Sequence, residues 1–417
     1  MKGRSGTELL SSPLTMTMDL PLQGVRILEL SQAIAGPFAM RTLADLGAQV
    51  IKVEQPGVGD MSRRMGPHFL RGESAYYLNF NRNKQGITLD LRNPRGRDAF
   101  YRLVGVSDAV FDAFRPSVLP RLGLDYDSLK QANPTIISCS LSAFGQEGPY
   151  RDRPGFDGIV QAMGGAMSVT GLEGQPPMFM GFPVGDLVGG YVAALGIASA
   201  LYARRDTGQG RRLDISLLDV QIALQGHLGQ FYLVSGEVPR PIGSSHPANL
   251  PVGAYQAQDG SYIQVHCASQ EFALRLLEMV SSEVPGMEAL AADPRFATQT
   301  DRIANRDALD QVLAQAFATK PRQEWVELCE EWSVPGGPVN NIAEALADPQ
   351  VQLRNMVVEI DHPVAGKYKT AGNPIKTGGD ERLQPPPTLG EHTDRLLLDL
   401  LGYSPSDVAY LRETDAV

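Results

Sequence analysis

One stretch, Gly181-Phe182-Pro183-Val184-Gly185-Asp186-Leu187, combines a single carboxylate with flanking glycines and leads into an apolar, alanine-rich segment. Across residues 187–203 the only ionisable side chains are the phenols of Tyr191 and Tyr202. The pattern predicts a helix with Asp186 at its amino-terminal turn, where free backbone N–H groups and the helix dipole favour negative charge. Asp186 is therefore the first candidate for chemistry.

Two roles fit Asp186. As an N-cap it would accept hydrogen bonds from the first turn of the helix, which is the commonest use of such a residue. As a nucleophile it would need room for a substrate, and Gly185, Gly189 and Gly190 would let a bulky group approach the backbone closely. Spacing alone leaves both roles open.

Composition excludes several other classes of protein. The formal net charge is -10, and no long run of lysine or arginine offers the basic face that a nucleic acid needs. Cys139, Cys267 and Cys329 are few and far apart, so we expect neither disulfides nor a C-x-x-C site, and a reducing cytoplasm fits. The six histidines form no H-E-x-x-H motif, so we expect no metal site.

The sequence offers one candidate for a membrane span and no signal peptide. Residues 1–20 mix both charge signs around a short apolar core, so we interpret them as a disordered leader. Residues 187–203 are barely long enough to cross a bilayer and are rich in glycine and alanine. We therefore expect a helix buried inside the protein and no membrane partner.

The first half of the chain alternates strands and helices. Helix signals separate the strands, among them Asn93-Pro94, Gly47 after a helix over 38–46, and a short helix that bears Arg121. The alternation predicts an α/β doubly wound domain with ligands beyond the carboxyl ends of its strands. Only Gly36 stands where G-x-G-x-x-G would lie, which disfavours a nicotinamide enzyme. The predicted strands are 25–30, 48–54, 87–91, 108–114, 135–141 and 211–217.

Composition changes after the last of these strands. Residues 146–180 predict a long irregular connection and 219–233 a helix, whereas 236–253 have the proline, glycine and serine content of a domain boundary. A hairpin with a D-G turn at 259–260 and several helices follow, which indicates a small α+β domain. We divide the chain into the leader 1–20, a large domain 21–235, a small domain 236–340 and a carboxyl-terminal segment 341–417.

Several stretches, in a shared order, resemble the class III CoA-transferases, the family of formyl-CoA transferase and carnitine CoA-transferase. The resemblance covers nearly everything after the leader. The stretches include Leu22-Gln23-Gly24-Val25, Leu46-Gly47-Ala48, Asn81-Arg82-Asn83-Lys84, Gly181 to Gly190, Gly336-Gly337-Pro338 and Leu389-Gly390-Glu391-His392.

The resemblance implies a Rossmann-like CoA-binding large domain to which the carboxyl-terminal segment returns, and a homodimer of interlocked ring-like subunits. It places Asp186 on the catalytic aspartate and Asp157 where formyl-CoA transferase has a supporting glutamate. No permanently bound cofactor is implied, since CoA and acyl-CoA are substrates. The implied CoA contacts are Gln32, Ala33, Ile34, Leu89, Arg92, Phe114, Arg121, Leu122 and Phe156.

Three positions depart from related proteins. The similar α-methylacyl-CoA racemases have a histidine directly before the aspartate at the place of Asp157, whereas this chain has Phe156. A phenyl ring cannot move a proton, which favours transfer over racemisation. Gln55 and Ala113 stand where the family often has arginine and asparagine, so part of the phosphate contact must differ.

We therefore expect a CoA-transferase that uses succinyl-CoA and a dicarboxylate, through an aspartyl anhydride and an aspartyl-CoA thioester on Asp186. The glycines around Asp186 would supply N–H groups for the oxyanion. Asp157 should be protonated, paired or pointed away, because its charge would raise the pKa of Asp186. Arg63 or Arg64 is a weaker candidate for the distal carboxylate. A 2-methylacyl-CoA racemase and a CoA-binding protein without activity remain as alternatives.

Overall fold

The computed structural model describes residues 20–378 and 383–417, which form two compact units. One unit contains the chain up to Asp157, Pro183–Val220 and Asn355–Val417, and the other contains Gly158–Phe182 and Gln221–Arg354. The predicted leader, apart from Leu20, lies outside the described residues. Residues 158–182, 221–235 and 341–354, which our division of the sequence placed outside the small domain, group with the second unit.

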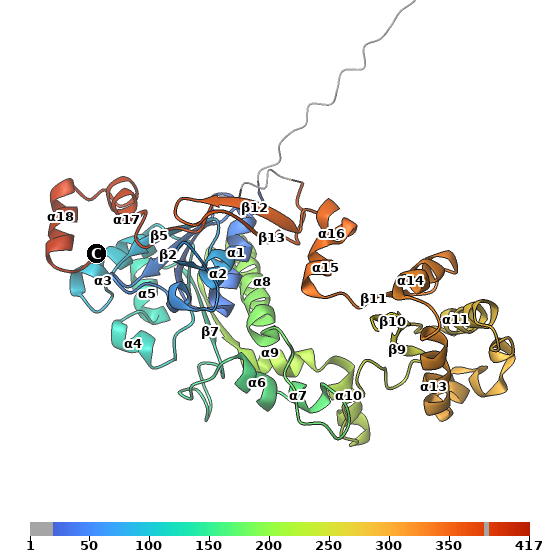
Figure 1. The fold of residues 1–417 in the computed structure, drawn as a ribbon. Coiled ribbons are helices and arrows are strands. Elements are labelled where there is room, and N and C mark those ends of the chain that lie inside the picture. Colours follow the sequence, from blue (N-terminus) through green and yellow to red (C-terminus); the bar gives the residue numbers. More distant parts are fainter. Residues whose placement is uncertain (1–19, 379–382) are drawn as a thin grey trace, which may run out of the picture. The chain divides into compact units, whose positions relative to one another are not determined.

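A six-stranded sheet with every pair of neighbours parallel forms the centre of the first unit (Figure 1). Its order is β5-β2-β1-β6-β7-β8, so the chain reverses direction across the sheet between β1 and β6. The predicted α/β parallel sheet is thus confirmed, and β1 and β6 flank its topological switch point. The strands are β1 (Arg26–Leu30), β2 (Gln49–Glu54), β5 (Lys84–Thr88), β6 (Ala109–Asp112), β7 (Ile137–Ser142) and β8 (Arg211–Ser216).

Helices cover both faces of this sheet (Figure 1). Strand residues such as Leu28 and Leu30 form one core with Phe100 of α3 (Pro94–Gly105) and Leu129 of α5 (Tyr126–Ala132). The chain end, which follows α17 (Thr393–Arg395), joins this core through the π-helical turn Leu396–Leu400 and α18 (Pro405–Glu413). On the other face, α1 (Ala35–Asp45) and α8 (Val184–Thr207) pack on each other and on the strands.

Helix α8 is apolar on both of its sides. It is the one helix in the described part of the chain that is long and apolar enough to cross a membrane. Ala193, Ile197 and Ala200 are buried, whereas Leu195 and Tyr202 are 69% and 70% exposed. The expected burial therefore holds on one side of the helix only, and an apolar strip remains exposed.

Three predicted elements differ from the observed ones. The strand expected over 87–91 begins three residues earlier, at Lys84. A lysine suggests an exposed position, but Lys84 is buried and forms an ion pair with Glu29, which no local pattern reveals. The helix expected over 219–233 is observed as two helices, α9 (Leu217–Leu224) and α10 (Gly226–Ser235). The break falls at Gly226, whose φ of 54° lies outside the helical range. The connection over 146–180 contains α6 (Asp157–Met163) and α7 (Ala166–Val169).

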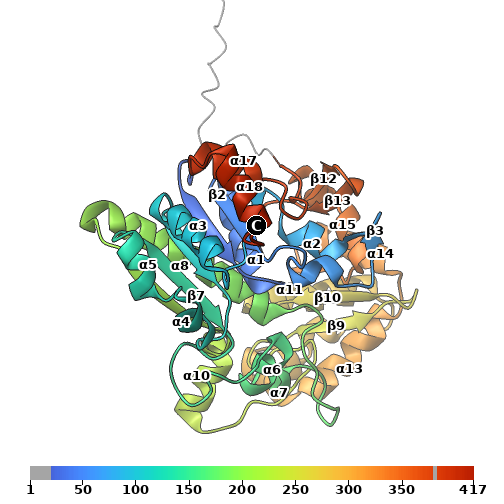
Figure 2. The same ribbon diagram turned by 90° about the vertical axis from the view of Figure 1, so that its left-hand side faces the viewer.

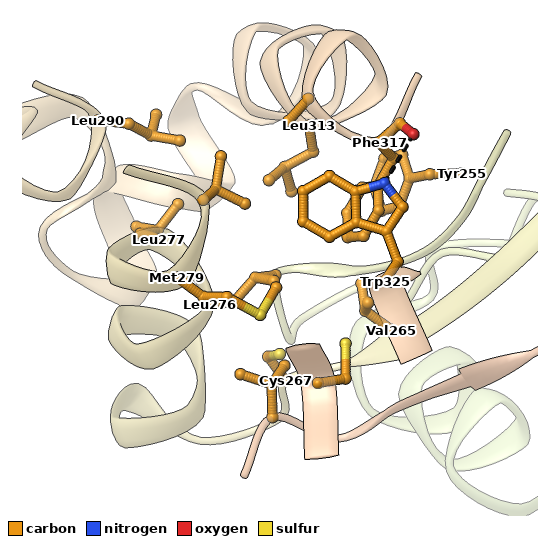
Figure 3. Close-up of a cluster of buried hydrophobic side chains, with 14 of the residues drawn as sticks. Tyr255, Val265, Cys267, Leu276, Leu277, Met279, Leu290, Leu313, Phe317 and Trp325 are labelled. Carbon is orange, nitrogen blue, oxygen red and sulfur yellow. Dashed lines mark hydrogen bonds between the residues drawn. The ribbon is translucent and has the colours of Figure 1, made fainter. Parts of the chain in front are cut away.

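The second unit has its own sheet and core. The predicted hairpin is present as β9 (Val252–Gln256) and β10 (Tyr262–His266), and β11 (Gly336–Pro338) pairs with β10. In the core (Figure 3), the indole N–H of Trp325 donates to the Phe317 carbonyl at 2.9 Å, and Tyr255 stacks on Phe317. The helices around this core are α11 (Gln270–Glu283), α12 (Gln299–Ala304), α13 (Arg306–Phe317) and α14 (Arg322–Glu331).

Shorter elements complete the two units. In the first unit, the hairpin of β12 and β13 packs Ile360 and Tyr368 against Leu78 of α2. Its short elements are η1 (Met61–Arg64), β3 (Phe69–Leu70), β4 (Glu73–Ser74), α2 (Ala75–Phe80), α4 (Val118–Leu122), β12 (Val357–His362) and β13 (Gly366–Ala371). Those of the second unit are η2 (Leu290–Ala292), η3 (Pro294–Phe296), α15 (Ile342–Ala347) and α16 (Pro349–Leu353).

Candidate active site

A cavity of about 250 Å³ lies beyond the carboxyl ends of β1, β2, β5 and β6. This is the edge of a doubly wound sheet at which ligands bind, and the cavity spans the switch point between β1 and β6. We call it the first cavity. Figure 2 labels β2 and α4, whose residues help to line it. Its lining residues are Leu30, Ser31, Gln32, Val53, Glu54, Gln55, Gly59, Asp60, Leu89, Asp90, Leu91, Arg92, Phe114, Val118, Arg121 and Leu122.

The first cavity brings together most of the residues expected to contact CoA. Residues Ala33 and Ile34 follow Gln32 on the loop that joins β1 to α1. Arg92 and Arg121 are exposed cations on its wall, and Leu89 is a buried apolar residue of the same wall. Six of the expected contacts line the cavity, namely Gln32, Leu89, Arg92, Phe114, Arg121 and Leu122.

A second cavity, of about 190 Å³, contains another expected contact, Phe156, and shares Phe114 with the first, whereas Ala33 and Ile34 line neither of the two. Three arginines that sequence reasoning missed also line it, namely Arg115, Arg151 and Arg153. Their positions soon after β6 and β7 were the available signal, since side chains that follow parallel strands collect at one edge of the sheet. The other lining residues are Ala113, Pro116, Ser142, Ala143, Pro154 and Gly155.

Glycine at position 36 allows α1 to begin directly behind the loop 31–34. A Cβ atom on Gly36 would lie 2.3 Å from the Cβ of Ser31 and 2.8 Å from the ring of Phe111. Such a close approach of helix and strands is possible only without a side chain. The loop that borders the first cavity is therefore held close to the switch point.

Asp186 is the third residue of α8, and its carboxylate does not cap the helix. The helix begins after Pro183 with no side-chain cap of its own. Instead Asp157, the first residue of α6, accepts hydrogen bonds from the backbone N–H groups of Gly185 at 2.7 Å and Asp186 at 3.2 Å. The structure thus assigns the capping role to Asp157 and leaves the Asp186 side chain without it.

The surroundings of Asp186 disfavour its charged form. Burial raises the pKa of Asp186 to about 7, and the negative charge of Asp157 adds to the shift. Within the described residues, no cation or hydrogen-bond donor contacts its carboxylate. Asp157 is paired with the main chain, as one of our expectations allowed, yet its charge still acts on Asp186. A carboxylate kept free of partners in this way keeps its lone pairs for a substrate.

The glycines that follow Asp186 serve helix packing, so the expectation that they admit substrate is wrong. A Cβ on Gly189 would lie 2.4 Å from Leu217, and one on Gly190 would lie 2.8 Å from the Ala35 carbonyl oxygen and from Phe38. The N–H of Gly185 is also occupied, by Asp157. Gly190 therefore locks α8, one turn beyond Asp186, to the start of α1 and the loop before it.

A series of neighbouring residues connects the two cavities with Asp186. Phe114 belongs to both cavities, Phe156 lines the second, and Asp157 directly after it contacts the backbone of Asp186. Phe156, on the wall of the second cavity, is thus next in sequence to the residue that caps α8 at Asp186.

Arg63 is not available for a substrate carboxylate. It donates two hydrogen bonds to Glu54, at 2.8 and 2.7 Å, and its guanidinium lies 3.7 Å from the centre of the Tyr77 ring. Arg64 donates to the Val58 carbonyl. In the described part of the chain, no group of three or more histidine, cysteine, aspartate or glutamate side chains is arranged to hold a metal ion.

The fold is a doubly wound α/β sheet with a cavity at its switch point, and the chain belongs to CoA-transferase family III, whose sequence profile matches residues 22–393. The resemblance found in the sequence is thus confirmed. The chain is 34% identical to human succinyl-CoA:glutarate CoA-transferase, over 95% of this chain and 90% of the human one.

Two further proteins show the same likeness. The succinate–glutarate CoA-transferase of Agrobacterium fabrum is 38% identical, over 91% of this chain and 96% of its own length. The crystal structure of a CaiB/BaiF family protein from Brucella suis superposes with a TM-score of 0.81 at 35% identity, covering 92% of this chain and all of that one. The similarity therefore extends over both units of the chain.

Proposed function

We propose that the protein transfers CoA from succinyl-CoA to a dicarboxylate acceptor, with Asp186 as the nucleophile. The observation that carries the proposal is the half-buried Asp186 carboxylate, which has no partner and a pKa raised to about 7, in the same unit as two adjoining cavities. The names of the human and Agrobacterium relatives supply the choice of succinyl donor and dicarboxylate acceptor. A dicarboxylate of the glutarate type is the preferred acceptor.

The nucleotide end of CoA would occupy the first cavity. Arg92 and Arg121 on its wall are cations suited to the phosphate groups of CoA. Phe114 would mark the passage to the second cavity, through which the pantetheine arm would run past Phe156 toward Asp186. Arg115, Arg151 and Arg153 supply positive charge along this route, where Gln55 and Ala113 replace residues that the family often uses.

The chemistry is a sequence of acyl exchanges at Asp186. Its carboxylate attacks the thioester carbonyl of succinyl-CoA, and the CoA thiolate leaves as a mixed anhydride forms. The thiolate then attacks the aspartyl carbonyl, which releases succinate and leaves an aspartyl-CoA thioester. The acceptor carboxylate attacks this thioester to form a second anhydride. The thiolate finally attacks the acceptor's carbonyl, which yields the new CoA ester and restores Asp186.

Asp157 supports this chemistry through its contacts with the backbone of the nucleophile and through its charge. By binding the N–H groups of Gly185 and Asp186 it fixes the first turn of α8. Its charge also raises the energy of the Asp186 carboxylate, which makes that carboxylate more basic and more nucleophilic once it is ionised. Asp157 thus acts on the nucleophile through position and charge.

The test is a matrix of acyl-CoA donors and free acids, scored by mass spectrometry for new CoA esters. The donors are succinyl-, acetyl- and formyl-CoA, and the acids are glutarate, oxalate, succinate and butyrate as a monocarboxylate control. We expect the fastest transfer from succinyl-CoA to glutarate and loss of all transfer in Asp186→Ala. Equal rates with butyrate would refute the dicarboxylate preference, and full turnover of Asp186→Ala would refute the mechanism.

A proton-exchange measurement, added to this assay, separates the alternatives. A racemase would exchange the α-proton of 2-methylacyl-CoA in heavy water, whereas Phe156 offers no proton-carrying group at the position of the racemase histidine. A protein that only binds CoA would form no new ester with any pair. Hydroxylamine trapping during turnover adds direct evidence, because it converts an aspartyl thioester on Asp186 into a hydroxamate that peptide mapping locates.

We also propose that the protein is an interlocked homodimer of the cytoplasm. The exposed apolar strip of α8, with Tyr191, Val192, Leu195 and Tyr202, is a surface that a second copy would cover. The three cysteines are free and buried, which suits a reducing compartment. Light scattering should give twice the chain mass of 45.1 kDa, and a monomer that retains full activity would contradict this assembly.

A further inference from the structure

A cluster of four charged side chains lies beneath the loop that borders the first cavity. Lys52 of β2 is completely buried and forms ion pairs with Glu29 at 3.1 Å and Asp60 at 2.8 Å. Lys84 of β5 pairs with the second oxygen of Glu29 at 2.8 Å, so two cations face two carboxylates. The ammonium group of Lys52 also donates to the Ser31 carbonyl at 2.9 Å, at the start of the loop.

Asp60 connects this cluster directly to the loop. Its Oδ2 atom faces Lys52, while its Oδ1 atom accepts hydrogen bonds from the backbone N–H groups of Ala33 at 3.0 Å and Ser62 at 2.8 Å. Ala33 has a φ of 67°, in the left-handed region that residues other than glycine rarely adopt. A backbone conformation of this kind persists only where surrounding contacts enforce it.

A second contact joins the same two segments. The Gln32 side-chain carbonyl accepts a hydrogen bond from the Met61 N–H at 3.2 Å. Gln32, Gly59 and Asp60 all line the first cavity, so the loop 31–34 and the segment 59–62 form adjoining parts of its wall. The orientation of this wall therefore depends on one carboxylate, Asp60, which Lys52 holds in place.

We propose that Asp60, fixed by Lys52, is a positioning residue that holds the loop 31–34 ready for the nucleotide end of CoA. This inference rests on the proposed placement of CoA in the first cavity. Buried ion pairs contribute little net stability compared with apolar side chains of the same size, and their better-attested use is to specify one geometry. Here the geometry specified is the left-handed turn at Ala33, which exposes Gln32 to the cavity.

A matched control lies in the same unit. Asp45 and Arg82 form a buried ion pair with a distance of 2.6 Å, and Asp45 also accepts from the Asn83 side chain. These contacts join the end of α1 to the segment before β5, away from the loop 31–34. Asp45→Asn therefore reports the cost of losing a buried charge without disturbing the wall of the cavity.

The test measures binding of free CoA by calorimetry in Asp60→Ala, Asp60→Asn and Asp45→Asn, with thermal unfolding as a measure of folding. Asparagine keeps an oxygen that can accept from Ala33, whereas alanine does not. We expect Asp60→Ala to weaken CoA binding about tenfold, the equivalent of one lost hydrogen bond, and Asp60→Asn to weaken it much less. Asp45→Asn should lower the unfolding temperature and leave CoA binding unchanged.

Two outcomes would overturn the inference. Asp60→Ala could bind CoA as tightly as the wild type, or Asp45→Asn could weaken binding as much as Asp60→Ala. Hydrogen exchange gives a test that needs no variant, because a loop already held by Asp60 must protect the Ala33 amide before CoA is added. Rapid exchange of that amide in the wild type without CoA would equally refute the proposal.

The design distinguishes this inference from the proposed function. If the wild type and Asp186→Asn bind CoA but Asp60→Ala binds it equally well, the inference about Asp60 fails while the proposed function stands. If neither the wild type nor Asp186→Asn binds CoA, the proposed function itself fails. In steady-state assays we further expect Asp60→Ala to raise the KM for the acyl-CoA while the KM for the acceptor acid changes little, a division that general loss of folded protein would not produce.

Discussion

Carboxylates at two places in the first unit have pKa values shifted in opposite directions. Glu29 and Asp60 face Lys52 and Lys84, and these cations and the hydrogen bonds to them hold the pKa values of both carboxyls below their usual range despite burial. Asp186 has another acid, Asp157, as its charged neighbour, and its pKa rises to about 7. Burial acts in the same direction at both places, so the difference comes from the partners.

This difference separates an acid that maintains structure from an acid available for reaction. The paired group has its charges neutralised and its oxygen atoms occupied, which fixes the loop beside the first cavity. The unpaired carboxylate remains high in energy, and a substrate can relieve that energy by forming a bond to it. Substitutions at the two places should therefore have opposite effects on stability and unequal effects on activity.

The largest effect is expected from removing the proposed nucleophile. Asp186→Asn should lower kcat/KM for CoA transfer by at least about 1000-fold, since no other carboxylate can form the covalent intermediates. CoA binding measured by calorimetry should stay close to that of the wild type. A fall of less than about tenfold in kcat/KM would show that Asp186 assists rather than carries the acyl group.

Breaking the paired group should cost stability. Lys52→Met leaves Glu29 paired with Lys84 but removes the cation that pairs with Asp60, and removing one member of a buried pair costs about 3 kcal/mol of unfolding free energy. Denaturant titration measures this loss. Lys367→Met, at an exposed pair with Glu359, serves as a control and should cost far less than Lys52→Met, because solvent screens an exposed pair. An equal loss of unfolding free energy in the two variants would contradict a structural role for the buried ion pairs of Lys52.

At Asp186, removing the charge should increase the free energy of unfolding. Because the pKa of Asp186 is raised on folding, the wild type loses stability as pH rises from the unfolded value near 4 to about 7. Asp186→Asn carries no such charge and should raise the free energy of unfolding at pH 8 by about 2 kcal/mol. This gain is about half of what the full pKa rise would give, because Asp186 is half-buried and partly screened by solvent. The gain should vanish near pH 4. A loss of stability at pH 8 would contradict the uncompensated burial of Asp186.

The smallest effect concerns the charge of Asp157. Only ionised Asp186 attacks, so kcat/KM for succinyl-CoA should rise with pH and level off above a midpoint near the pKa of about 7. Asp157→Asn keeps an oxygen for the N–H groups of α8 but removes the charge, which should lower the midpoint. The shift should be less than about one pH unit, because burial is the larger cause. An unchanged midpoint would show that the charge of Asp157 does not raise the pKa of Asp186.

Local patterns were sufficient for much of the fold. Asn93 and Pro94 correctly marked the start of α3, and the alternation of strands and helices correctly indicated a parallel sheet. Asp186 lies in the first turn of its helix, as the apolar run after it indicated. These features depend on hydrogen bonds and periodicities within a few residues, so the sequence alone contains them.

Other features came only from contacts between distant segments. Lys84 did not look like the first residue of a buried strand, because its partner Glu29 lies on another strand. The spacing around Asp186 could not show that Asp157, from α6, caps α8, or that Gly190 packs against Ala35. The type of Asp186 and its place on the helix were thus determined by the sequence. Its missing partner and raised pKa were decided by the tertiary structure, because burial and the surrounding charges exist only once remote segments meet.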